Sequence, residues 1–376
     1  MDSSRGKKSG KPSSGKKRSQ KKTTAKRVRE ERADAFRRGV NSILLVILIL
    51  IVLFGLYEGW VFLGRPGWPE RPSAERAACV ELYFHDSAVA YLVPVHRRVM
   101  LARNDSLTAR AVQEFATGPR DPMLARVYPA NIPVPAIKLE KDVAVIDLPE
   151  EILDNWSGED RQQALLNALC MTVVAAGDAS KVRILVAGEA LQAASEGFAL
   201  DKPLSAPDFV NLVPDRSLEG EPDWVTAFFL DSTGRYLMPL ALQVAPGGHE
   251  AEKAIEAVLG APPSEVDPGP LPVAPEGYRL DRLIIENGLA TVDIRVPDTQ
   301  TAFLGYDINL FRRAVYLTLK KCCQVSDIAV ELNGRPIESY GRFGNLVALE
   351  SIECWNLEAE GSRFEENGAE FEEGSA

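Results

Sequence analysis

Few side chains in this sequence have the types and spacing that chemistry requires. His85 and Asp86 are adjacent and could form a metal-binding or acid–base pair. A related stretch later in the chain has Leu230 and Asp231 at the corresponding places, so the aspartate recurs and the histidine does not. An aspartate at the end of a strand commonly closes a turn. We therefore interpret Asp86 as a turn residue and assign His85 no catalytic role.

Two further carboxylates deserve the same test. Asp147 and Asp293 each follow a short apolar run and could belong to a site, but a strand end bonded to nearby N–H groups explains them better. They also fall in different parts of the chain, which argues against a shared pair. We expect His96 and His249 to be solvated and Cys170 to be a small core residue.

The motifs of several enzyme classes are missing from the sequence. It has no G-x-S-x-G elbow, no phosphate-binding loop of the P-loop kind and no H-E-x-x-H. Three histidines and five cysteines without C-x-x-C spacing leave few zinc ligands. We predict a protein without catalytic, cofactor-binding or metal-binding residues, and not an enzyme.

The pairing of the cysteines is left open by the sequence. Cys322 and Cys323 are adjacent, which strains a bond between them, and the odd count leaves at least one thiol free or paired with another chain. Whether Cys79 and Cys354 form bonds does not follow from their positions.

The clearest pattern is a repeat with an offset of 142 to 146 residues. A period this long indicates tandem domains rather than a solenoid. The matching segments are Leu82–Ser87 with Phe228–Thr233, Tyr91–Val99 with Tyr236–Val244, Ala111–Pro119 with Ala254–Pro262, Leu139–Leu148 with Ile285–Ile294, and Ala168–Gly188 with Ala314–Gly334.

Each copy reads as a small α+β unit. Two strands come first, and Pro94 or Pro239 in the second lacks an N–H, which favours an edge position. An amphipathic helix, a hairpin, a second helix and a last strand follow; Asn287-Gly288 is a strong hairpin signal. The apolar stripes are Leu107, Ala111, Val112 and Phe115, then Leu165, Ala168, Leu169, Val173 and Ala176 in the first copy, and Ala254, Ile255 and Val258, then Phe311, Ala314, Val315 and Leu319 in the second.

A long apolar segment precedes the repeats. Residues 43–57 carry no charge, and a helix over 40–63 is long enough to cross a membrane. Arg37 and Arg38 precede it, which places the N-terminus in the cytoplasm and residues 65–376 outside. A cleaved signal peptide is the alternative, but the basic region and apolar run are long for one.

Charge is divided unevenly along the chain. Residues 1–39 hold 15 Lys and Arg against 4 Asp and Glu, whereas the whole chain has a net charge of −10. We expect a disordered cytoplasmic tail drawn to anionic lipid headgroups. A nucleic-acid role is not expected, because no aromatic side chain is interleaved with the basic residues before Phe36.

The expected organisation follows from these observations. We predict a basic tail at 1–39, a membrane helix at 40–63, a first domain at 77–192, a linker at 193–221, a second domain at 222–338 and an acidic tail at 339–376. Apolar Phe209, Val210 and Leu212 suggest that the linker docks on a domain. From Asn356 onward the Glu-rich sequence predicts disorder.

The two copies resemble the GerMN domain family. The motifs that carry the resemblance are LYFHD, YLVPVHRRV, EFATGP and VAVIDL in the first copy, and FFLD, YLMPLALQV, PEGY, LATVDI and YLTL in the second. The resemblance covers about residues 80–337. It implies a sheet packed on helices, similar to the ring-building modules of secretion systems, and a role in endospore formation and germination. The first copy departs from the family pattern by having ANIP where the second has PEGY, and the spanning helix departs from the lipoprotein anchor common in the family.

Three hypotheses follow for the function. The leading one is a non-enzymatic, membrane-anchored assembly protein that associates with itself or with other sporulation envelope proteins, as part of a ring or channel complex between mother cell and forespore. The second is a sensor that binds a germinant or cell-wall fragment between its two domains. The third is a peptidoglycan hydrolase that uses paired carboxylates.

Overall fold

A computed structural model describes residues 45–57, 75–103, 105–155, 159–190, 202–218, 221–263, 266–343, 346–347, 349 and 354–358. The chain divides into two compact units, Met1–Pro72 and Ser73–Ala376, which are described separately.

The described part of the first unit is one helix, residues 45–57. Its large apolar side chains, from Leu45 to Tyr57, are all exposed. Over the residues that the structure describes, no helix has the length and apolarity needed to cross a membrane. The remainder of the expected span, residues 40–44 and 58–63, lies outside the described residues, as does the basic tail.

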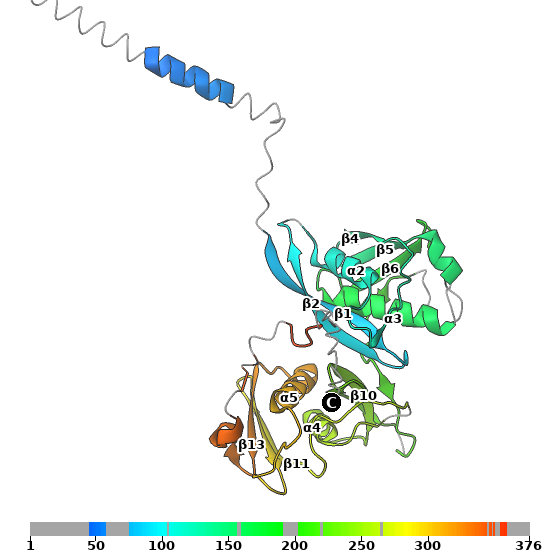
Figure 1. Ribbon diagram of the computed structural model, residues 1–376, viewed down its shortest axis with the longest axis vertical. Coiled ribbons are helices and arrows are strands. Elements are labelled where there is room, and N and C mark those ends of the chain that lie inside the picture. The colour runs from blue at the N-terminus through cyan, green and yellow to red at the C-terminus, as the bar shows by residue number, and fades with distance from the viewer. Residues whose placement is uncertain are drawn as a thin grey trace, which may run out of the picture. The chain divides into compact units, whose positions relative to one another are not determined.

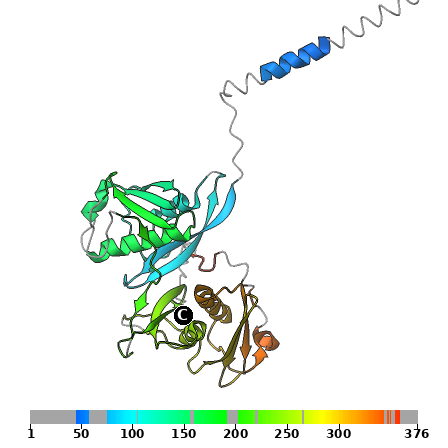
Figure 2. The same ribbon diagram turned by 180° about the vertical axis from the view of Figure 1, so that it is seen from behind.

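The second unit consists of two similar halves (Figures 1 and 2). The elements of the first half are β1 (Arg76–Asp86), β2 (Leu92–Leu101), α2 (Leu107–Thr117), β3 (Leu124–Ala125), β4 (Ala136–Glu140), β5 (Val143–Leu148), the 3-10 helix η1 (Glu150–Asn155), α3 (Glu159–Ala175), β6 (Lys181–Val186) and β7 (Leu204–Ser205). Those of the second half are β9 (Asp223–Leu230), β10 (Leu237–Val244), α4 (Glu250–Leu259), β11 (Arg279–Glu286), β12 (Leu289–Arg295), α5 (Ile308–Cys322), β13 (Asp327–Leu332), β14 (Arg335–Pro336), η2 (Ile337–Ser339) and η3 (Gly341–Phe343). A short strand, β8 (Leu212–Val213), lies between the halves in sequence.

Each half contains two sheets with the same connections. The first two long strands form an antiparallel hairpin, β1 with β2 and β9 with β10. The second sheet has the order β4-β5-β6-β7 in one half and β11-β12-β13-β14 in the other, with the central pair parallel in each. A helix joins the parallel strands, α3 in the first half and α5 in the second, as a parallel pair requires. The α+β expectation is therefore confirmed, with both halves built alike.

The predicted apolar stripes form the cores. The four stripe residues of α3, Ala176 directly after it and all four of α5 are buried, and so are Ala254, Ile255 and Val258 of α4. In the first half the rings of Phe84 and Phe115 stack with centroids 5.8 Å apart. The predicted hairpin at Asn287-Gly288 is also confirmed: both residues have positive φ, 51° and 82°, as a type I′ turn requires.

Two expectations about the segments outside the halves met different outcomes. The docking of the linker is confirmed, because β8 pairs in parallel with β10 of the second half. The expectation of disorder from Asn356 is wrong for Asn356–Glu358: Asn356 and Glu358 are buried, 4% and 3% exposed. Because these side chains are acidic or polar, the composition predicted that they are exposed to solvent. Both instead form hydrogen bonds with buried groups, which are described below. Residues 359–376 lie outside the described residues.

Candidate site between the two halves

The aspartates singled out in the sequence bond to the backbone of their own half. Oδ1 of Asp86 accepts hydrogen bonds from the N–H groups of Ala90 at 2.8 Å and Tyr91 at 2.9 Å. Oδ1 of Asp231 accepts from Arg235 and Tyr236, both at 2.9 Å. Both aspartates thereby close the turn between the two strands of a hairpin.

Asp147 and Asp293 also play matching parts. Oδ1 of each accepts a hydrogen bond at 2.8 Å from a glycine N–H, Gly188 in the first half and Gly334 in the second. The glycines have φ of 80° and 75°, a left-handed conformation that glycine adopts without strain. The two aspartates do not act together, because each is bonded within its own half.

His85 is buried beside helix α3. Its Nε2 lies 3.3 Å from the backbone oxygen of Ala164, while its Nδ1 has no hydrogen-bond partner among the described residues. Burial lowers the pKa of His85, which keeps the imidazole neutral. Within the described ranges no group of three His, Cys, Asp or Glu side chains is placed to hold a metal ion.

The polar side chains that join the halves are different ones. Two short segments, here called the first clasp (residues 209–213) and the second clasp (residues 354–358), each follow one half in sequence and pair with the other. In the first clasp Leu212 pairs in parallel with Ala241 of β10. In the second clasp Leu357 pairs in parallel with His96 of β2. The clasps thus cover the outer edges of β10 and β2.

An asparagine in each clasp fastens both halves at once. The side chain of Asn211 accepts from Leu92 N at 2.7 Å and donates to the oxygens of Leu92 at 2.8 Å and Pro239 at 2.7 Å. The side chain of Asn356 accepts from Leu237 N at 2.9 Å and donates to the oxygens of Leu237 and Pro94, both at 2.6 Å.

The hydrogen bonds of the two asparagines are related by the sequence repeat. Each residue of the second set lies 145 positions from its counterpart in the first, with the halves exchanged. Pro94 and Pro239 fit this edge because their missing N–H removes a donor that the asparagine could not satisfy. The interface is therefore a pseudo-twofold arrangement built by the duplication itself.

The second clasp carries additional bonds that the first lacks. Arg97, 1% exposed, donates through Nε to the Glu358 carboxylate at 2.8 Å and through Nη1 to Glu114 at 2.9 Å. The other Glu358 oxygen accepts from the backbone N–H groups of Arg120 and Asp121. Such a buried carboxylate is tolerated because every charge near it is paired.

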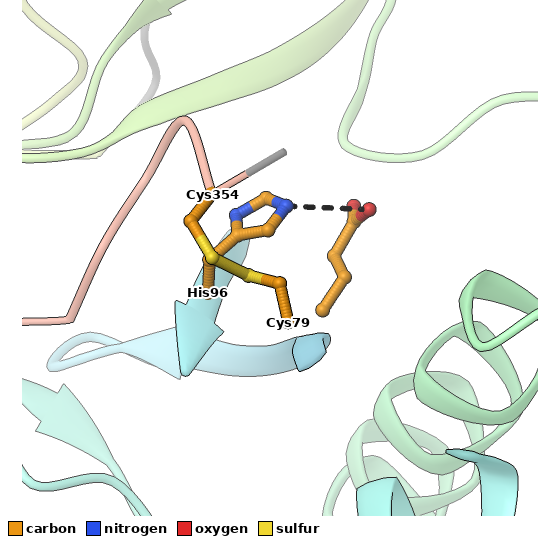
Figure 3. Close-up of a disulfide and its surroundings, with 4 residues drawn as sticks. Cys79, His96 and Cys354 are labelled. Atoms are coloured by element: carbon orange, nitrogen blue, oxygen red, sulfur yellow. Dashed lines mark ion pairs between the residues drawn. A yellow bond between two sulfur atoms is a disulfide. The ribbon is translucent and has the colours of Figure 1, made fainter. Parts of the chain in front are cut away.

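A disulfide joins Cys79 of β1 to Cys354 of the second clasp, with 6.0 Å between their Cα atoms. Figure 3 shows this bond beside His96. The remaining thiols, Cys170, Cys322 and Cys323, are free. The pairing that the sequence left open is therefore settled between the two cysteines most distant in the chain.

The expectation that His96 is solvated is wrong. Its side chain is 4% exposed, lies against the Trp355 ring with centroids 4.9 Å apart, and has Nε2 3.7 Å from the Glu81 carboxylate. Burial, and then the positive charge of Arg313, lower the pKa of His96 to about 4. Burial raises the pKa of Glu81, although a hydrogen bond from Tyr83 opposes this shift.

A pocket of about 290 Å³ lies between the halves. Its walls contain equivalent residues from both repeats, among them Tyr83 with Phe228, Pro94 with Pro239, and Val210 with Trp355. Tyr83 pairs with Pro94 and Phe228 with Pro239, so the match of Leu82 with Phe228 expected from the sequence is wrong by one residue. Glu81, Asp208, Lys320 and Lys321 add charge to this mostly apolar lining. Both clasps contribute a wall, so the pocket is complete only when both are docked.

The residues of this interface were not among the candidates chosen from the sequence, because those candidates were residue types that are common in catalytic and metal sites. The signal was present in the repeat, since Val210-Asn211-Leu212 and Trp355-Asn356-Leu357 stand at the common offset of 145. It lies beyond the last repeated strand, in segments that composition marked as a linker and a tail.

The architecture defines the class first: tandem α+β domains with a shared interface. Residues 81–192, the first half, match the family described as Germane, sporulation and spore germination. The pair of halves has the fold of the tandem GerMN domains of the sporulation protein GerM from Bacillus subtilis, with a TM-score of 0.53, 19% identity, and coverage of 69% of this chain and 92% of that one. The two halves thus share the fold of these tandem domains, and the first half matches the model of a domain family described by sporulation and spore germination.

Two single-domain structures are also similar. The first GerMN domain of the same Bacillus subtilis protein has 19% identity and a TM-score of 0.25, covering 31% of this chain and 86% of that one. A putative lipoprotein from Clostridium perfringens has 21% identity and a TM-score of 0.25, covering 34% and 87%. No curated protein matches the chain in sequence.

Proposed function

We propose that the protein is a non-enzymatic, membrane-anchored assembly protein of endospore formation and germination, with its two GerMN-like domains outside the cytoplasm. The observation that carries the proposal is that the polar residues common to both halves, Asp86 with Asp231 and Asp147 with Asp293, bond to backbone N–H groups. The polar residues that both copies share therefore stabilise the turns of the domain. This favours a structural role for the protein over a catalytic one.

The anchor rests on the apolar helix. Residues 45–57 expose a continuous apolar surface on every side, which suits lipid contact and would be unfavourable in water. The basic residues before it favour a cytoplasmic N-terminus. The Cys79–Cys354 bond supports the outer location of the domains, because disulfides persist in oxidising compartments.

Assembly would follow from tethering. Copies held in one plane by the helix have a raised effective concentration, so weak contacts between domains are sufficient. Heterologous contacts would close into a ring if the rotation between copies allows it, as part of a complex between mother cell and forespore.

The test compares association in solution and in bilayers. The full chain is labelled fluorescently, and copies per spot are counted by photobleaching in supported bilayers of increasing protein density and in dilute detergent. We expect single copies in detergent and growing assemblies in bilayers. Single copies at every density would reject the assembly role. A fluorescent fusion spread evenly over the envelope during sporulation would reject its placement between mother cell and forespore.

The pocket between the halves favours a second candidate, recognition of a small amphipathic ligand such as an amino acid or a cell-wall fragment. Aromatic walls with a few charged groups are typical of ligand sites, although about 290 Å³ is at the small end of their range. Calorimetry of the full chain with amino acids and muropeptides tests it. Saturable binding that Thr226→Trp abolishes, with Thr117→Trp on the exposed side of α2 as control, is the expected result; no binding rejects this candidate.

A further inference from the structure

The second clasp differs from the first in its place in the chain. The first clasp runs directly from β7 of one half towards β9 of the other, so folded structure follows on both sides. The second clasp follows the second half and reaches back across the interface to β2 of the first half. The outer edge of β2 in the first half is therefore covered by a segment that follows the second half in sequence.

The two clasps are also fastened differently. In the second clasp Cys354 is bonded to Cys79. The residues 145 positions before Cys354 and after Cys79 are Phe209 of the first clasp and Trp224 of β9, whose ring centroids lie 6.1 Å apart. The second clasp thus has a covalent bond (Figure 3) at the place where the first clasp has an aromatic contact.

The outer edge of β2 together with Arg97, here called the groove of the first half, suits the second clasp better than the first. Arg97 is buried there and pairs with two carboxylates, Glu114 of the first half and Glu358 of the second clasp. The repeat places Val213 and Leu242 at the matching positions of the other clasp and groove, which pair as neighbours through β8 and β10. The first clasp in the groove of the first half would leave Arg97 with Glu114 alone and would place the apolar Val213 against its guanidinium, which disfavours that pairing.

We propose that this groove also accepts the second clasp of another copy of the chain, so that the Cys79–Cys354 bond forms between two copies and links the second half of one to the first half of the next. The inference deepens the proposed assembly function and rests on it. Exchange between copies keeps the Cys79–Cys354 bond and the Arg97–Glu358 pair. It also keeps the hydrogen bonds of Asn211 and Asn356 where the second half of one copy lies against the first half of the next.

The choice between the two arrangements then depends on concentration. Within one chain the second clasp competes at the effective concentration set by its own connection, and between chains it competes at the local density of neighbours. Copies confined to a membrane plane raise that density, so anchoring favours exchange. The link runs from second half to first half, and it therefore extends into chains or closes into a ring.

The covalent step balances as an ordinary thiol oxidation. The Cys354 thiol of one copy and the Cys79 thiol of the next each lose a proton and together give two electrons to a small disulfide. That oxidant is reduced to two thiols as the new S–S bond forms.

The test uses two full-length variants that cannot form the bond alone, Cys79→Ser and Cys354→Ser, both carrying Cys322→Ser and Cys323→Ser. They are reconstituted together into bilayers at high density, and oxidised glutathione is added. We expect the mixture alone to give a species at twice the 41.1 kDa of one chain, removable by reductant. Adding Glu358→Arg to the Cys79→Ser partner should lower its yield at least tenfold, whereas Glu276→Arg on the exposed surface of the second half should not.

A second probe separates folding defects from absent exchange. A synthetic peptide of residues 351–360 carries Cys354 and Asn356, and we expect it to form a mixed disulfide with Cys79 of the Cys354→Ser chain. Capture of the peptide without the double-mass species would overturn the proposal, because the groove would then bind a free clasp segment but not the clasp of a neighbouring copy. Absence of both products would also overturn it. Assembly of the Cys79→Ser chain in bilayers without any mixed cross-link would keep the assembly function and reject the exchange.

Discussion

The buried imidazole of His96 makes the stability of the interface depend on pH. Its pKa is about 4 in the folded protein and 6.5 in the unfolded chain, because burial disfavours the charged form. Between these values the unfolded chain binds more protons, so stability falls as the pH drops from 6.5 to 4. The full loss below pH 4 is on the order of 3 kcal/mol, from 1.4 kcal/mol for each pH unit.

The measurement is urea unfolding of the full chain in detergent across this pH range, compared with His96→Gln. Glu81 faces His96 and contributes with the opposite sign, because its raised pKa makes its share of stability largest in acid. The difference between the two proteins isolates His96. His249→Gln, at an exposed helix start, is the control, and an equal pH dependence in wild type and His96→Gln would contradict the assignment.

The two clasp asparagines allow a matched test at equivalent positions. Asn356→Ala leaves the Leu237 N–H and two buried carbonyl groups without their partner, which we expect to cost about 3 kcal/mol of unfolding free energy. Asn211→Ala should cost less, because its hydrogen bonds are only partly buried. The Asp variants keep the acceptor and lose the donors, so they should lie below wild type as well; urea unfolding that ranks Asn211→Ala as the more harmful would contradict this account.

At the scale of elements, one hydroxyl in each half ties the second helix to the first strand. Thr172 of α3 accepts from Tyr83 N at 3.0 Å, and Thr318 of α5 accepts from Phe228 N at 3.1 Å. Both hydroxyls are fully buried. A valine there keeps the shape but leaves a buried N–H unpaired, so we expect each Thr→Val change to cost about 1–3 kcal/mol.

Urea unfolding of the two variants and of Thr117→Val tests this prediction. Thr117 lies on the exposed end of α2, where its hydroxyl donates to the backbone oxygen of Gln113. Its loss should shift stability by less than about 0.5 kcal/mol. A Thr172→Val or Thr318→Val chain as stable as the control would show that the helix is held by packing alone.

The elements themselves were largely predictable, for a physical reason. Apolar residues at helical spacing, such as Leu165, Leu169 and Val173, must face a core, and a single Asn-Gly pair fixes a hairpin locally. The clasps were not predictable in this way, because their contacts cross from one half to the other: Asn211 bonds to Leu92, 119 residues away, and Asn356 to Pro94, 262 residues away. In the sequence Asn356 begins a polar, Glu-rich segment. Only the fold brings the carbonyl groups of Pro94 and Leu237 next to its side chain.

At the scale of the whole molecule, duplication explains why one interface suits both halves. A domain whose trailing segment caps the second strand of its neighbour can pair with a copy of itself, and fusing two copies yields the pseudo-twofold pair. The chain then breaks this symmetry at one end, with Cys354, Glu358 and Arg97 where the other end has apolar residues. Because only the second clasp carries a cysteine, the docking of this clasp can be measured by the reactivity of the Cys79 and Cys354 thiols.

The last prediction follows from that bond and from the proposed location outside the cytoplasm. The chain has five cysteines, of which Cys170, Cys322 and Cys323 are free. Full-length protein taken from its native membrane, blocked at once and unfolded, should therefore react with three equivalents of a maleimide–polyethylene glycol reagent, and with five after reduction. Cys354→Ser should give four in both conditions, because Cys79 loses its partner. Five reactive thiols in the unreduced wild type would mean that the domains reside in a reducing compartment, since the disulfide cannot persist there.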